Sequence, residues 1–388
     1  MKRDLDLSRF FCINPACSLH NQKSQSNIVY RSMTGKDRHI MRLRCTACGK
    51  EFSERKYTLQ ERSHLSGDKL TLIMRCIRWG VPREGISDIC DVNIKTVDAY
   101  LDKGSEHAQR WHESHVVDLE EEVQADEAYG KISGRAARWI AAAITMRSLL
   151  IIALSFGTRD QSLCDTLIAR VLAACKRVPM FLTDGWAPYA SSLCRMLGHL
   201  FVPVGKRVAR MRCRGVMLAQ VVKRRDARGR LLDVTMRAVM GGAHKCCSYF
   251  KGKGLGNVIH TIHIERWFGS LRSYARSFQR RSRFLPKLHK RQEASCWLYV
   301  HFYNWLIPHK TLSKRFKKLC TPAMAAGLCS CPLDYGQWIS TPVIPQVEKR
   351  EGKWLKTAQD PIRLKAYKRS PTGRGKVIYK TDMEAIAC

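Results

Sequence analysis

The stretch EVQADEAYG, residues 122–130, alternates apolar and polar residues, which predicts a strand with Asp126 on one of its faces. A second block, PMFLTDGW at residues 179–186, is typical of a short apolar strand with Asp184 at its carboxyl end. Gly185 then allows a sharp turn into the following helix. Further elements are expected around these blocks: strands at 139–145 and 149–157, and helices at 161–176 and 187–197. Strands and helices that alternate in this way predict an α/β domain.

A third acidic residue, Glu265, lies in IHIERWFGSLR, residues 262–272, which has the pattern of a helix. A carboxylate within a strand, one at a strand end and one on a helix can converge at the carboxyl edge of a sheet. Oxygen ligands of this kind suit Mg²⁺. We therefore expect Asp126, Asp184 and Glu265 to bind two Mg²⁺ (or Mn²⁺) ions that promote in-line displacement at phosphorus. Arg272, two helical turns after the glutamate on the same face, is expected to hold a DNA phosphate.

Several neighbouring side chains are alternatives for these roles. Glu127 adjoins the first aspartate but is predicted to point to the opposite face of its strand. His260 and His263 precede the glutamate, and a structural role is favoured for both because the carboxylates suit Mg²⁺ without them. Trp186 and Trp267 are expected in the core or the wall of the site, although either ring could stack on an unpaired base.

Four cysteines near the start of the chain form two pairs with metal-ligand spacing. Cys12 and Cys17 are a C-x4-C pair, and Cys45 and Cys48 are a C-x2-C pair, with 27 residues between the pairs. Two such turns can complete a tetrahedral Zn²⁺ site, and the strand-like segments 27–32 and 39–45 lie between them. Residues 8–58 are thus predicted to form a zinc ribbon with a structural Zn²⁺, the alternative being four unrelated buried thiols.

Residues 66–115 have helical periodicity and predict a helix-turn-helix module. A short helix is expected to begin after Pro82, and a third helix near Asn93. The last helix of such a module can lie in the major groove, which would place Lys95 and Thr96 near base edges. Three short amphipathic helices also occur as a plain scaffold, so the pattern alone leaves both interpretations open. The apolar positions of the first helix are Leu70, Ile73, Met74 and Ile77.

The charge balance is the most unusual bulk property of the chain. Its 388 residues include 68 lysines and arginines against 33 acidic residues, a net charge of +35. So large an excess needs a polyanionic partner or heavy counterion screening, and double-stranded DNA is the expected partner. A membrane surface is a weaker alternative because the basic residues are not confined to one amphipathic helix.

Cysteine usage and apolar stretches indicate a soluble cytoplasmic protein associated with the nucleoid. The 17 cysteines are odd in number and mostly scattered, and the start, MKRDLDLSRFFC, lacks the apolar core of a signal peptide. The most apolar run, residues 139–156, is interrupted by Arg147 and rich in β-branched residues, so two buried strands explain it better than a membrane span.

Basic residues are concentrated between Gly205 and Arg291, where 23 lysines and arginines accompany three acidic residues. Strand-like runs at 216–222 and 231–239 flank a turn, so residues 205–258 are interpreted as a basic insertion between the second aspartate and the glutamate. Its arginines are expected to follow the DNA backbone, the alternative being a solvated hairpin. The arginines singled out for DNA binding are Arg224, Arg225, Arg228 and Arg230.

In chain order, QADE, TDGW and IERxxxxLR resemble the motif blocks of insertion-sequence transposases of the DDE type, and in particular the family of insertion sequence one. The two N-terminal modules are similar to that family's arrangement. The ending YNWLIPHKTL (303–312) with TPAMAAG (321–327) resembles YNxxRPHxxL…TPAxAAG, with Ile307 in place of the usual arginine. The resemblance covers roughly residues 12–327.

The resemblance implies an RNase H-like catalytic domain with a mixed sheet over residues 120–300. Asp126, Asp184 and Glu265 would be its catalytic triad, and Arg272 the basic residue that follows the glutamate. It implies a bacterial or archaeal transposase that binds the terminal inverted repeats of its element as a homodimer or higher oligomer. The enzyme would cleave a phosphodiester with water and join the freed 3′-OH to target DNA.

A helical tail over 301–340 and a basic, flexible segment over 341–388 complete the expected organisation. Two other functions remain open. One is a domesticated or inactive DNA-binding regulator, and the other is a structure-specific nuclease on the same fold.

Overall fold

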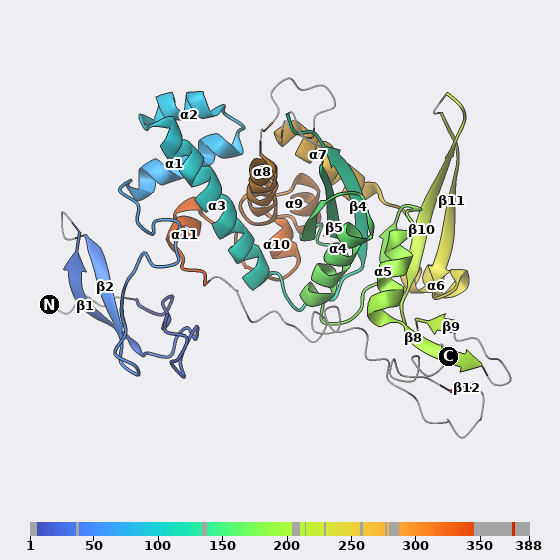
Figure 1. The fold of residues 1–388 in the computed structure, drawn as a ribbon, viewed down its shortest axis with the longest axis horizontal. Helices are drawn as coiled ribbons and strands as arrows, with labels where there is room; N and C mark the ends of the chain where they lie inside the picture. Colours follow the sequence, from blue (N-terminus) through green and yellow to red (C-terminus); the bar gives the residue numbers. More distant parts are fainter. Residues whose placement is uncertain are drawn as a thin grey trace, which may run out of the picture. The chain divides into compact units, whose positions relative to one another are not determined.

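The computed structural model of the chain describes residues 6–35, 39–133, 138–203, 210–213, 215–228, 230–256, 259–275, 278, 286, 288–344 and 375–376. The chain folds into two compact units, whose elements Figure 1 labels. The first unit comprises Met1–His115, Ala294–Ile307 and Cys331–Val347. The second comprises Val116–Glu293, Pro308–Ser330 and Glu348–Cys388. Each unit therefore combines segments that are far apart in the sequence.

The N-terminal part of the first unit is a small antiparallel sheet. Its strands are β1 (Ile28–Thr34), β2 (Ile40–Cys45) and β3 (Glu51–Ser53), in the order β1-β2-β3. The two strands predicted between the cysteine pairs are confirmed. Four buried apolar residues pack with three of the four cysteines in one cluster: Phe10, Ile28, Leu43 and Phe52.

Three helices follow, as the periodicity predicts: α1 (Gly67–Arg78), α2 (Arg83–Cys90) and α3 (Ile94–His115). The Ser66 hydroxyl caps α1 by accepting from the Lys69 N–H at 3.2 Å. The chain leaves α2 through Asp91, whose φ of 47° lies in the left-handed region and gives the tight turn before α3. The three helices thus have the outline of a helix-turn-helix, with a last helix of 22 residues.

The second half of α3 packs in a core that C-terminal segments complete. These segments are α8 (His289–His301), the π-helical turn η2 (Phe302–Leu306) and α11 (Tyr335–Ser340). The Trp111 ring meets the Trp305 ring edge-on, with centroids 5.9 Å apart, and His301 stacks on Trp338 at 4.3 Å. The His107 Nε2 atom lies 2.9 Å from the Trp338 carbonyl oxygen. The first unit therefore depends on residues near both ends of the chain.

The second unit is built on a six-stranded mixed sheet with the strand order β11-β10-β7-β4-β5-β6. β4, β5 and β6 form an antiparallel meander, β7 and β10 extend it as parallel strands, and β11 returns antiparallel to β10. The predicted α/β class with a mixed sheet is confirmed. The strands are β4 (Val123–Gly130), β5 (Arg138–Thr145), β6 (Ile151–Gly157), β7 (Phe181–Thr183), β10 (Leu218–Arg225) and β11 (Leu231–Met240).

These pairings align the carboxyl ends of four strands. β4, β6, β7 and β10 all run in one direction, because β5 is antiparallel to both of its neighbours while β7 and β10 are parallel to β4. Whatever follows these four strands is consequently gathered at one edge of the sheet, which we call the carboxyl edge.

The second unit also contains several helices, and some of them pack on the sheet. α4 packs against β5 and β6 and against α5, and α7 packs against β4 and β5. The helices are α4 (Gln161–Ala174), α5 (Pro188–Leu197), α6 (Ala243–Gly252), α7 (Ile262–Tyr274), α9 (Lys310–Phe316) and α10 (Pro322–Ala325). Of the helices in the described ranges, none combines the length and the apolar composition required to cross a bilayer.

The predicted basic insertion needs a correction, because much of it belongs to the main sheet. β10 pairs with β7 over Leu218–Gln220, and Val221 packs against Phe250 of α6 in a buried cluster. The run of small and β-branched residues in β10 fits a central strand that is buried on both faces, which the surrounding arginines obscured in the sequence.

The rest of the predicted insertion and of the C-terminal segment is described only in part. β8 (His199–Pro203) pairs antiparallel with β9 (Arg210–Arg212) and with β12 (Gly375–Lys376). Most of the segment 341–388 that we predict to be flexible lies outside the described residues.

Candidate metal centres

The four cysteines of the predicted ribbon come together at one point. Their sulfur atoms all lie within 4.8 Å of one another. Cys12 Sγ is 3.5 Å from Cys48 Sγ, and Cys17 Sγ is 4.0 Å from Cys45 Sγ. A tetrahedral Zn²⁺ with Zn–S bonds of about 2.3 Å separates its sulfurs by roughly 3.8 Å. The cluster therefore has the donor atoms and the spacing of a structural zinc site.

Local backbone geometry shapes this cluster. Gly49 has a φ of 72°, and its N–H donates to the Cys45 carbonyl at 2.9 Å, which closes the turn between the second pair of thiols. The buried Asn27 donates from Nδ2 to Cys45 Sγ at 3.2 Å. A hydrogen bond of this kind orients a thiolate ligand and offsets its charge. The role of Asn27 was not predicted, since a single amide gives no spacing signal.

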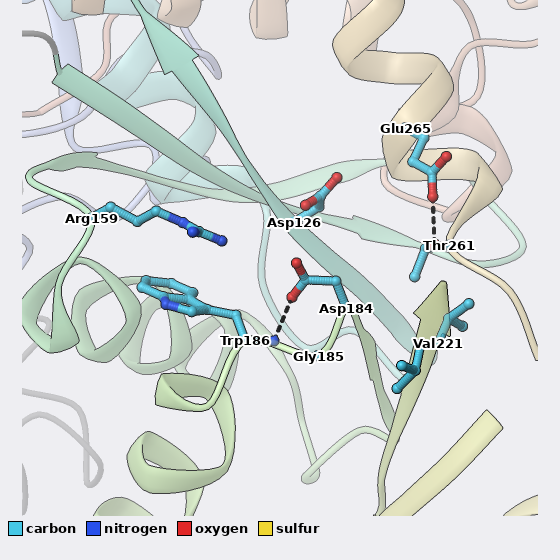
Figure 2. A pocket seen from close by; sticks show the side chains of 9 residues that line it. Asp126, Arg159, Asp184, Gly185, Trp186, Val221, Thr261 and Glu265 are labelled. Atoms are coloured by element: carbon cyan, nitrogen blue, oxygen red, sulfur yellow. Dashed lines mark hydrogen bonds between the residues drawn. The ribbon is translucent and has the colours of Figure 1, made fainter. Parts of the chain in front are cut away.

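A second candidate site is a pocket of about 510 Å³ at the carboxyl edge of the six-stranded sheet. The three predicted acidic residues, Asp126, Asp184 and Glu265, all line it, together with Arg159 and Trp186. Figure 2 shows the Asp126 and Asp184 carboxylates directed into the same space, with Glu265 on the side away from Arg159. The structure therefore brings together the three carboxylates that the sequence motifs singled out.

Strand register explains why the two aspartates meet. β4 and β7 are parallel and pair Gln124 with Leu182. Asp126 lies two residues beyond Gln124, and Asp184 lies two residues beyond Leu182, so both side chains leave the same face at the same level. Asp184 Oδ1 accepts from the Trp186 N–H at 2.9 Å, which holds the carboxylate at the turn into α5.

Burial and the crowding of negative charge make it unfavourable for the carboxylates of this site to be ionised together without a cation. Burial, reinforced by the negative charges of Glu127, Asp184 and Glu265, raises the pKa of Asp126 to about 7. Carboxylates that crowd in this way suit a divalent cation, because its charge offsets their mutual repulsion. The donor set therefore fits Mg²⁺ or Mn²⁺, as the sequence predicts.

Glu127 lies closer to this site than the alternation of its strand predicts. Its carboxylate is within 4.8 Å of those of Asp126 and Asp184, so it reaches the same site even though it follows Asp126 directly in the strand. β7 stops pairing with β4 at Gln124, so from Asp126 onward β4 is flanked only by β5, and its other side is open where the carboxylates meet. Burial, together with the charge of Asp184, raises the pKa of Glu127.

Both oxygens of Glu127 are already engaged by protein donors. Oε1 accepts from Arg159 Nε at 2.9 Å and from Arg159 Nη2, and Oε2 accepts from the Tyr189 hydroxyl at 3.1 Å. The three acidic residues in closest proximity are thus Asp126, Glu127 and Asp184. Of these three, Glu127 is the residue that forms an ion pair with a side chain of the protein, Arg159.

Arg159 is the functional candidate that the sequence motifs missed. Its guanidinium lies between two indole rings, 4.9 Å from the Trp139 centroid and 5.0 Å from the Trp186 centroid, and it faces the pocket (Figure 2). Stacking of this kind limits the orientations of the guanidinium, whose Nε and Nη2 donate to Glu127 while Nη1 takes no part in that ion pair. The signal that could have found it is its position two residues after β6, at the same edge as the two aspartates.

Gln124 ties the helix that carries Glu265 to the strand that carries Asp126. Its fully buried side chain accepts at Oε1 from the backbone N–H groups of His263 at 3.0 Å and Ile264 at 3.1 Å. Its Nε2 donates to the His260 carbonyl at 2.7 Å. No side chain of the helix itself caps α7, so Gln124 satisfies first-turn donors that would otherwise be buried without partners.

We expect Gln124→Ala to lower the catalytic rate by about 100-fold with little change in DNA affinity, because a shift of about 1 Å in a positioned group has an effect of this order. Single-turnover kinetics would measure this loss. Gln124→Glu keeps the acceptor oxygen and should restore only part of the rate. Gln220→Ala is the matched control, since Gln220 is equally buried but bonds Arg237 on β11 instead of α7. Equal losses of catalytic rate in the two variants would mean that Gln124 acts only as a core residue.

Arg272, Lys95 and Thr96 lie outside the pocket, whereas Trp186 lines it. Arg272 is half-buried on α7 and does not line the pocket, where Arg159 supplies the guanidinium instead. Lys95 is exposed and Thr96 is half-buried in the first turn of α3. Trp186 forms part of the pocket wall and Trp267 is buried, which confirms both expectations.

The predicted DNA-binding arginines lie at the end of the β10–β11 hairpin. Arg224, Arg228 and Arg230 are exposed, whereas the Arg225 side chain is outside what the structure describes. β10 continues five residues beyond Gln220, its last pairing with β7, which corresponds to about 17 Å of extended chain. The hairpin thus projects from the carboxyl edge, where the acidic pocket lies.

Comparisons of the chain with models of known protein families and with curated protein sequences give no match. Its own geometry is therefore the basis for a functional proposal.

Proposed function

We propose that this chain is a DDE-type DNA transposase, with an RNase H-like catalytic domain in its second unit. The observation that carries the proposal is the common pocket of Asp126, Asp184 and Glu265, contributed by a strand, a strand end and a helix. A three-stranded antiparallel meander extended by two parallel strands supports the RNase H-like assignment. The motif blocks around the three carboxylates support it independently.

The residues of the pocket have complementary tasks in this proposal. Asp126, Asp184 and Glu265 would hold two Mg²⁺ or Mn²⁺ ions. When bound, such ions activate an oxygen nucleophile and stabilise the departing oxygen at phosphorus. Arg159, fixed by Glu127 and two indole rings, would contact a non-bridging oxygen of the scissile phosphate. It takes the phosphate-binding role that the motif pattern predicts for Arg272.

The front of the chain supplies DNA recognition in this proposal. The Cys12, Cys17, Cys45 and Cys48 cluster would bind Zn²⁺ and fold the ribbon, and α3 would place Lys95 and Thr96 in the major groove of the terminal repeats. The net charge of +35 provides the sequence-independent part of the affinity for both element ends and target DNA.

The decisive experiment incubates the zinc-loaded protein and Mg²⁺ with DNA that carries the ends of the element. We expect a nick that frees a 3′-OH, followed by joining of that end to a second DNA. Nicking without joining would favour a structure-specific nuclease. Specific end binding without nicking would favour a regulator that lacks catalysis, and neither binding nor nicking would refute the proposal.

Salt dependence tests the contact between the hairpin and DNA. Each neutralised phosphate contributes roughly −0.9 to the slope of log affinity against log salt concentration. We expect replacement of the four hairpin arginines by glutamine to flatten this slope by about two to four units on specific and random DNA alike. The replaced residues are Arg224, Arg225, Arg228 and Arg230.

The control for this titration removes exposed charge elsewhere in the same unit. Lys176 and Arg177 follow α4 and pair with Glu120, which precedes β4 at the opposite edge of the sheet. Their replacement by glutamine should leave the slope nearly unchanged. A hairpin variant whose slope matches the wild type would mean that the hairpin is solvated and does not meet DNA.

A further inference from the structure

The two edges of the six-stranded sheet differ in how they are protected. β6, at one edge, buries its first five residues. β11 lies at the other edge and is ten residues long (Figure 1). Its apolar side chains Leu232 and Val234 are 59% and 49% accessible. Within the described residues no strand pairs with the outer side of β11, so its outward N–H and C=O groups have no ladder partner there.

Natural proteins protect such an edge with proline, a short strand, a β-bulge or charged side chains. The pairing of β11 with β10 shifts only near its two ends, between Leu231 and Asp233 and between Ala238 and Met240, and is regular from Asp233 to Ala238. β11, with the sequence LLDVTMRAVM, contains no proline. Its two charged residues, Asp233 and Arg237, are exposed, opposite in sign and placed symmetrically about Thr235. Two copies of this strand in antiparallel register would consequently attract each other at the charged positions, where charges of one sign would repel.

The whole central part of the strand is self-complementary in that register. With Thr235 opposite its own copy, Asp233 faces Arg237 and Val234 faces Met236, while Leu232 faces Ala238. Opposite charges, Thr–Thr pairs and apolar pairs are the cross-strand combinations that stabilise antiparallel sheets.

The apolar face has a second reason to pair in this way. Met236 and Ala238 are partly buried because they pack against the cluster formed by β7, β10 and α6. Leu232 and Val234, nearer the hairpin tip, are exposed. The antiparallel register sets the exposed half of one strand beside the partly buried half of the other, so the apolar cluster of each copy would extend over its partner's exposed residues.

We propose that β11 is a dimerisation strand, which pairs antiparallel with β11 of a second copy about a two-fold axis at Thr235 and joins the two sheets into one. An isologous contact of this kind closes after two copies. The inference does not depend on the proposed chemistry, since a regulator or a nuclease with the same strand would dimerise equally.

Charge reversal tests the register. Sedimentation of the zinc-loaded full chain, freed of nucleic acid, should show a dimer. Asp233→Arg and Arg237→Asp each place like charges opposite one another twice, so each should raise the dimer dissociation constant at least about tenfold. The double variant restores opposite charges and should restore the dimer. An equimolar mixture of the two single variants should form a heterodimer, because every charge then faces its opposite.

A cross-link provides a second measurement that does not rely on the charge variants folding correctly. Thr235→Cys lies on the proposed axis, so mild oxidation should join the two introduced thiols in a symmetric disulfide that mass spectrometry can map. Leu232→Cys is the control, because its two copies would be six residues out of register, about 20 Å apart. A monomeric wild type, single variants that dimerise normally, a double variant as weak as the singles, or absence of the symmetric cross-link would each overturn the proposal.

Discussion

Alanine at any one of Asp126, Asp184 and Glu265 is expected to abolish cleavage of element-end DNA while binding of that DNA persists. The three carboxylates line one pocket, and each would be a ligand of the catalytic ions. Loss of a ligand removes several kcal/mol of transition-state stabilisation. Since about 1.4 kcal/mol corresponds to a factor of ten, the cleavage rate should fall by about 10³-fold or more. Single-turnover cleavage and gel-shift titrations of each variant would measure the two effects separately.

Glu127 is the matched control, because its carboxylate belongs to the closest acidic group and yet it bonds Arg159 and Tyr189. Glu127→Gln loses the ion pair but keeps the shape of the side chain. If Glu265 is the third ligand, Glu265→Gln should be inactive and Glu127→Gln only about tenfold slower, through a less firmly held Arg159. The reverse ranking would transfer the ligand role to Glu127.

Loss of zinc should have the largest effect on the folded structure. The ribbon has a small core and few apolar contacts beyond the cysteine cluster. Zinc binding at such a site contributes on the order of 10 kcal/mol of folding free energy. We expect one zinc per chain, and we expect Cys17→Ser to lose it, unfold the ribbon and weaken specific end binding. The acidic pocket lies in the other unit, so metal-dependent nicking of random DNA should remain.

Elemental analysis and protease sensitivity of residues 8–58 would check this expectation. Cys331→Ser removes an exposed thiol of the same unit outside the cluster, and it should keep both zinc and end binding. Protein purified without chelator that contains no zinc, or a Cys17→Ser variant that keeps its metal, would count against the ribbon.

Helices and strands whose apolar residues recur at regular spacing were predictable from the sequence. The strands that carry Asp126 and Asp184, the helix that carries Glu265 and the paired cysteines were all found, since each depends on local alternation or spacing. Their convergence was predictable too, because parallel strands bring their carboxyl ends to one edge.

Residues whose role depends on where a strand pairing ends were not predictable. Glu127 reaches the site because β7 stops pairing with β4 two residues before Asp126. Arg159 and Gln124 act through single contacts between segments far apart in the chain, and no spacing marks such contacts in advance. The place of β10 in the main sheet was not predicted either. The arginines around it made the segment look like a charged hairpin, although three of its positions pair with β7.

The division of the chain into units sets an order for synthesis. The first unit begins at the N-terminus but includes 294–307 and 331–347, and the second includes 308–330. On a ribosome, the helices that precede residue 115 emerge long before the segments bearing Trp305 and Trp338 that complete their core. The core of the first unit can therefore be completed only after residue 338 has been translated, whereas the six-stranded sheet of the second unit is complete at residue 240. A chain cut short before residue 294 would therefore keep the strands of the six-stranded sheet and lack the C-terminal segments that complete the core of the first unit.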